Sequence, residues 1–151
     1  MRDKQFVAEH RGGSLSIEQH CQLILWACDC SNHVLHLFGK RSDKRLTNAL
    51  NVAKVWKQGK ASVGDARKAA LGAIAVANEF SDKTAIAVAR VVGHAVATAH
   101  MADHCLASAW YALKAVESAG GSIDEERRWQ NEQLTSEVLD LVLTARKSRN
   151  I

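Results

Sequence analysis

The chain has 151 residues, of which 47% are apolar, 24% charged and 5% aromatic, and this balance excludes a disordered chain. It contains no proline and about two dozen alanines. An all-β fold of this length needs many turns, which are rarely built without proline, so the composition argues against a β-sandwich. We therefore expect an all-α fold, a single-domain helical bundle of about five to six helices.

The formal net charge of +4 is too small to predict a nucleic-acid partner, but it is unevenly distributed. The stretch from Lys40 to Lys68 holds nine basic and two acidic residues, so the rest of the chain is net negative. Such a stretch is typical of a solvated helix surface, and it also suits a docking face for an acidic partner or a phosphate. We expect Lys54, Lys57 and Arg67 to belong to such a docking patch.

The cysteines and the start of the chain indicate a compartment. Cys21, Cys28 and Cys30 fall inside one predicted helix, where they are badly placed to form disulfides, and Cys105 lies far away in the sequence. The opening residues 1–13 are polar, unlike a secretory leader, and no apolar run reaches the roughly 18 residues of a membrane span. We expect reduced thiols and a cytoplasmic protein with no membrane partner.

The first half of the chain predicts a lead-in and three helices. Residues 1–15 are expected to be flexible, before one helical domain over 16–147 and a tail at 148–151. Ser16 and Gln19 form a capping-box pattern that opens a helix over about 17–38. A second helix is predicted over about 43–58, and Ser62 with Asp65 caps a third that runs to about Phe80 and is faced with alanines.

From residue 82 to 119 the sequence is apolar without a clear stop. One helix of that length would be about 57 Å long, too long for a domain of this size. We therefore predict a break near 101–103, with Asp103 as the cap of the following helix. A last helix is predicted from Ser122, which has Glu125 three residues on, to Arg146 in a basic last turn that suits the helix dipole.

Histidines are the clearest candidates for chemistry. His100 and His104 are four residues apart, as in metal-binding pairs on one helix face, and His94 precedes them; zinc or another divalent metal would suit such ligands. The alternative is that these imidazoles only form hydrogen bonds across packed helices. On the first helix, Asp29 could orient His33, or the two could be an ordinary surface contact. No motif specifies a reaction, and no catalytic residue is predicted.

The predicted helices also carry short motifs whose order and spacing are specific as a set. The longest is Gly93-His94-Ala95-Val96-Ala97-Thr98-Ala99-His100, followed by His104 and by Tyr111-Ala112-Leu113-Lys114-Ala115. Shorter ones lie in the other helices: Trp26-Ala27, Asp29-Cys30, His33-Val34-Leu35, Ala53, Trp56, Gly59, Ala66-Arg67, Ala69-Ala70, Arg128-Trp129-Gln130, Gln133-Leu134 and Leu141-Val142. Together, from about Cys21 to Arg146, they resemble a family of bacterial immunity proteins associated with polymorphic toxin systems.

The resemblance implies an all-helical protein that binds and neutralises a cognate toxin. The candidate binding residues are Asp29, His33, His94, His100, His104 and Arg67. The chain departs from the family pattern because it lacks a proline after His100 and after Leu134, and a histidine in the third helix. The alternatives are a bundle that binds a metal or small molecule through the histidines, perhaps as an enzyme of unspecified reaction, and a structural homodimer joined through alanine-rich faces.

Overall fold

A computed structural model describes residues 3–39 and 43–151 of the chain. Within these ranges the seven α-helices are α1 (Ile17–Val34), α2 (Lys44–Lys57), α3 (Val63–Glu79), α4 (Lys83–Ala97), α5 (His104–Ser118), α6 (Ile123–Glu132) and α7 (Leu139–Arg149). A short 3-10 helix (Leu35–Phe38) extends α1 to the predicted end. The all-α prediction is confirmed, and the expected five to six helices become seven. Lys40 and Arg41 of the basic stretch lie outside the described residues.

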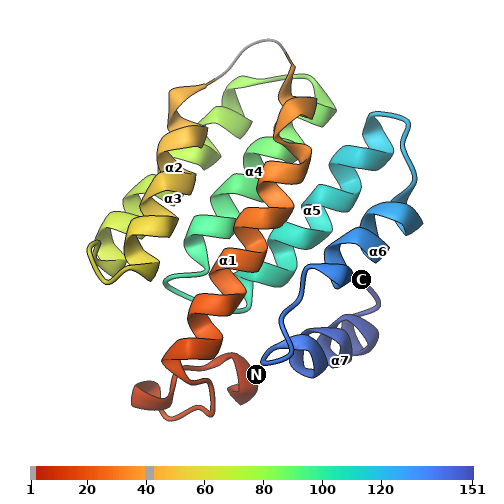
Figure 1. Ribbon diagram of the computed structural model, residues 1–151. Helices are drawn as coiled ribbons and strands as arrows, with labels where there is room; N and C mark the ends of the chain where they lie inside the picture. Colours follow the sequence, from red (N-terminus) through yellow and green to blue (C-terminus); the bar gives the residue numbers. More distant parts are fainter. Residues whose placement is uncertain (1–2, 40–42) are drawn as a thin grey trace.

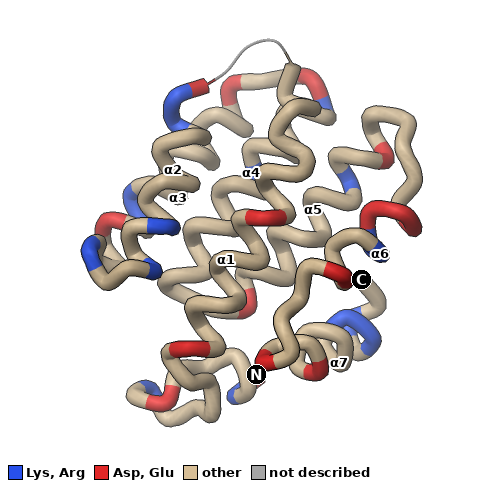
Figure 2. Tube along the Cα trace, in the orientation of Figure 1, with Lys and Arg blue, Asp and Glu red and all other residues tan. Residues whose placement is uncertain are grey.

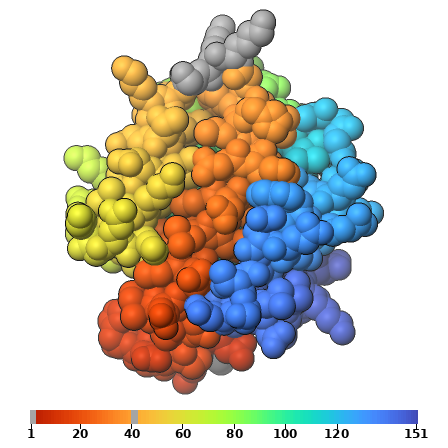
Figure 3. All heavy atoms as spheres, in the orientation of Figure 1, coloured from red at the N-terminus to blue at the C-terminus, as the bar shows by residue number. Residues whose placement is uncertain are grey.

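Helix α4 is the centre of the bundle. It packs against α1, α2, α3 and α5, and in Figure 1 it lies behind α1, between α3 and α5. Its sequence is apolar on nearly every side, as expected for a helix covered by others. Gly93 lets it approach α3 closely, because a Cβ there would come to 3.3 Å from Cγ1 of Ile74. Figure 3, in the same orientation, shows α1 at the surface of the molecule, between α2–α3 and α6–α7.

The predicted break after α4 forms without a proline. The Thr98 carbonyl, which would otherwise continue the helical hydrogen bonds, accepts a hydrogen bond from Nε2 of His20 at 2.6 Å. Tighter bonds replace the helical pattern, such as that from the amide of His100 to the carbonyl of Ala97. Asp103 occupies the N-cap position of α5, but the prediction that its side chain caps the helix is wrong. The backbone of Asp103 is helical, and the first amides of α5 donate hydrogen bonds to carbonyl groups of the preceding turn.

The single last helix predicted to Arg146 is instead two helices, α6 and α7. Short-range bonds end α6, including one from the amide of Leu134 to the carbonyl of Asn131. Thr135 and Ser136 follow, and both have lower helix propensity than the residues before them. The break turns α7 back, so that Val138 and Val142 are buried and Arg146 reaches α6.

The segment before α1 packs against the bundle. It contains two short 3-10 helices (Lys4–Phe6 and Glu9–Arg11), and Phe6 and Leu15 are buried in the core. A Cβ on Gly13 would collide with the backbone of Val7, so glycine is required where the segment folds back on itself. The residues expected to form a flexible lead-in thus contribute to the core. At the other end, α7 continues through Arg149 into the expected tail.

Candidate functional site

The structure brings two of the three candidate histidines together. Nδ1 of His94, near the end of α4, lies 2.9 Å from Nδ1 of His104 at the start of α5, so one ring donates a hydrogen bond and the other accepts it. His94 also stacks on Tyr111, with ring centroids 5.3 Å apart. Burial, with the nearby His104 and Arg90, lowers the pKa of His94 to about 4. The ring of His94 is therefore neutral at physiological pH.

The third histidine of the motif lies elsewhere. The break between α4 and α5 separates His100 from His104, so the two do not share one helix face, as a break near 101–103 implies. His100 lines a hollow of about 380 Å³ under the N-terminal segment, together with His20, Trp56 and Met101. His20 is buried there, and desolvation lowers its pKa. In the described parts of the chain, no three His, Cys, Asp or Glu side chains form a group that could hold a metal ion.

His33 lies apart from both the His94–His104 pair and the hollow lined by His100, on the outer side of α1. Its Nδ1 lies 2.9 Å from a carboxylate oxygen of Glu126 on α6, and its ring stacks on Trp129 with centroids 3.5 Å apart. Glu126, not Asp29, orients this imidazole. Asp29 is exposed on α1. Partial desolvation of its carboxyl group raises its pKa, and the positive charge of Lys54 on α2 opposes that shift. The five predicted Asp and His side chains therefore do not form one pocket.

A buried polar network that the sequence analysis missed joins α6 and α7 to the core. Arg146 is 4% exposed and donates to Gln130 Oε1 at 2.8 Å and to Asn131 Oδ1 at 3.0 Å. Gln130 is fully buried and donates to the carbonyl of Ala109, and Trp26 donates to the carbonyl of Gln130. The sequence predicts Arg146 only as part of a basic last turn that suits the helix dipole. Its burial follows from the turn between α6 and α7.

The cysteines are reduced, as expected. Cys28, Cys30 and Cys105 are buried and Cys21 is partly buried. Burial raises the pKa of the Cys28 thiol to about 12, and it raises the pKa of the other two buried thiols as well. These thiols are therefore protonated at neutral pH and act as small apolar side chains in the core.

The basic stretch forms one face of the molecule, over α2 and α3. Figure 2 shows lysine and arginine gathered along these two helices and the loop between them. Six of these side chains are exposed: Lys44, Lys54, Lys57, Lys60, Arg67 and Lys68. We call this surface the α2–α3 face. The three predicted docking residues all belong to it.

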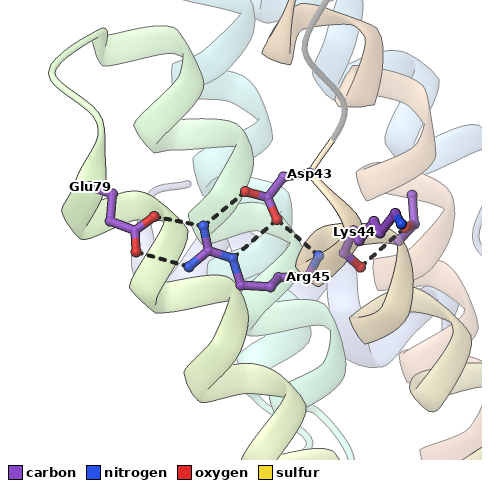
Figure 4. Close-up of polar contacts among 5 residues, drawn as sticks. Asp43, Lys44, Arg45 and Glu79 are labelled. Atoms are coloured by element: carbon purple, nitrogen blue, oxygen red, sulfur yellow. Dashed lines mark hydrogen bonds and ion pairs between the residues drawn. The ribbon is translucent and has the colours of Figure 1, made fainter.

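A groove of about 520 Å³ runs between the two helices of the α2–α3 face. Asn48, Asn51, Lys60 and Lys68 line it, and Gly72 lies at the α3 side. At one end Arg45 joins the two helices, because its guanidinium bonds Asp43 at the start of α2 and Glu79 at the end of α3, as Figure 4 shows. Arg45 is therefore neutralised by two carboxylates, whereas the lysines along the groove contribute net positive charge.

Fold and surface together define an all-helical bundle that presents an exposed basic face. A family model described as "Imm-5 like putative immunity protein" matches residues 13–137, and the chain belongs to that family. This confirms the resemblance seen in the sequence motifs. No curated protein and no solved structure matches the chain. Among the described residues, every helix is too short or too polar to cross a membrane.

Proposed function

We propose that the protein is a cytoplasmic immunity protein that binds its cognate toxin directly and blocks it. Membership of the immunity protein family supports the general kind of function. The observation that carries the binding mode is the α2–α3 face, where six basic side chains are exposed and two of them, Lys60 and Lys68, line a groove. A surface of one charge favours an oppositely charged partner and accelerates its association. The toxin surface that docks here is therefore acidic.

The Arg45 bridge supports this assignment. It fixes the start of α2 to the end of α3 through contacts of 2.9 Å to Asp43 and 2.6 Å to Glu79. A docking surface built on two helices held in one arrangement loses little conformational entropy when it binds. The toxin is then inactivated if the bound immunity protein covers its active site or its target-binding surface.

Charge reversal tests the proposal. The probe is the toxin domain encoded beside the gene of this chain, with binding measured by isothermal titration calorimetry and protection measured as survival of cells that express the toxin. The K54E/K57E/R67E variant is expected to weaken binding and protection. The matched control, K83E/R128E/K147E, changes the net charge equally at exposed residues outside the α2–α3 face and is expected to bind more tightly than the first variant. Equal binding by the two variants would contradict docking at this face.

A further inference from the structure

Gly72 occupies a position for which the isolated chain offers no reason. It lies in the interior of α3, where glycine costs about 1 kcal/mol relative to alanine. Its backbone is ordinary right-handed helix, and a Cβ added there would meet no atom within 4 Å. Gly93 on α4 differs, since a Cβ there would meet Ile74. Neither backbone conformation nor packing within the described chain therefore calls for glycine at position 72.

The surroundings of Gly72 show what lies open beside it. It borders the α2–α3 groove, whose apolar part is formed by Val52, Val55 and Ala69. Amide side chains of Asn48 and Asn51 and the ammonium groups of Lys60 and Lys68 also line the groove. The groove thus combines apolar surface, amide donors and acceptors, and positive charge.

We propose that an acidic segment of the toxin lies in this groove, with its backbone or a small side chain passing directly over Gly72. Glycine suits a position that another backbone approaches closely, because any side chain would fill the space. The lysines suit carboxylates on the segment, the asparagine amides suit its peptide groups, and Val52 and Val55 offer apolar contacts within the groove. The inference rests on the proposed function and names the part of the toxin that is recognised.

A second copy of this chain is a poor occupant of the groove. Two α2–α3 faces brought together would place exposed lysines and arginines against each other, and like charges across an interface disfavour association. The one acidic side chain that lines the groove near its lysines is Asp65, and it is already bonded to Ser62 in the α3 capping box. An acidic partner meets like charge at Asp65 but opposite charge at Lys60 and Lys68.

The test fills the groove without disturbing the fold. Gly72→Leu places a side chain in open space and raises helix propensity, so its melting temperature is expected to equal or exceed that of the wild type. Its affinity for the toxin domain encoded beside the gene is expected to fall about tenfold or more, with Gly72→Ala between the two. The matched control is Gly64→Leu, also exposed on α3 but outside the groove. It is expected to bind like the wild type.

Three results would overturn the inference. Wild-type affinity in Gly72→Leu would show that the groove is empty in the complex, and equal losses in both leucine variants would show a general effect on α3. A wild-type dimer that Gly72→Leu converts to a monomer in sedimentation would make a second copy the occupant. Failure of the wild-type chain to bind the toxin at all would instead refute the proposed function, which distinguishes the two.

Discussion

Arg146 offers the sharpest test of how the bundle is held together, because it is a buried cation with hydrogen bonds but without a counter-charge. In the described ranges, no carboxylate lies within 4.0 Å of its guanidinium, and its Nε has no hydrogen-bond partner. Desolvation lowers its pKa accordingly. Removing the guanidinium therefore loses the two hydrogen bonds that this charged group donates, but it also relieves the free-energy cost of burying the charge.

The two effects can be separated with two variants. Arg146→Met keeps the apolar stem and leaves the buried Oε1 of Gln130 without its donor, so after partial relief of the charge we expect a loss of about 1–2 kcal/mol in the free energy of unfolding. Arg146→Ala also removes buried methylenes worth about 0.8 kcal/mol each, which brings the loss to about 3–4 kcal/mol. At ~2–4 °C per kcal/mol for a chain of this size, the melting temperature of Arg146→Ala should fall by about 10 °C.

The assay is urea unfolding followed by circular dichroism, with thermal melts as a second measurement. The double variant Arg146→Met/Gln130→Met removes the Gln130 Oε1 acceptor together with its donor, so it should recover part of the loss of Arg146→Met. The recovery is only partial because the bond from Gln130 to the carbonyl of Ala109 is lost as well. If Arg146→Met is as stable as the wild type and Arg146→Ala is no worse, the bonds from α7 to α6 contribute nothing to stability, and the role given to Arg146 in holding the bundle together is wrong.

Three further outcomes are expected. His94 has a pKa of about 4 in the folded chain and a reference pKa of 6.5, so between these pH values the unfolded chain binds more protons than the folded chain. The free energy of unfolding should therefore fall as the pH drops from 6.5 towards 4, by ~1–2 kcal/mol after solvent screening. Urea unfolding of His94→Gln over the same pH range should show a shallower fall. Gly93→Ala should stay within about 1 kcal/mol of the wild type in the same assay, whereas Gly93→Val should lose about 1–3 kcal/mol by crowding Ile74. Protein purified without a histidine tag should contain less than one equivalent of metal by elemental analysis, and a thermal shift on adding zinc or nickel would favour the metal-binding alternative instead.

The features predicted correctly from the sequence depend on neighbouring residues. Ser16 with Gln19 and Ser62 with Asp65 form both bonds of a capping box, as their spacing predicts. Ser122 likewise accepts a bond from the amide of Glu125. Helix starts are encoded within four residues, so a single sequence is enough to find them.

The features missed depend on residues far apart in the chain. The partner of His33 is Glu126, 93 residues away, and the sequence around neither residue indicates this pairing. The burial of Arg146 depends on the turn between α6 and α7 and on bonds to residues 15 and 16 positions earlier, which helical periodicity does not reveal. Gly72 could have been noticed as a glycine inside a helix, but the groove beside it exists only in the folded chain.

The central claim is that this immunity family member acts by binding a toxin through the α2–α3 face. Its most direct test is calorimetric titration of the intact chain with the toxin domain encoded beside its gene, repeated at low and high salt. We predict saturable binding that weakens as salt rises, because basic side chains meet an acidic surface. No binding at either salt concentration, or an affinity that is unchanged by salt and by reversal of Lys54, Lys57 and Arg67, would contradict the claim.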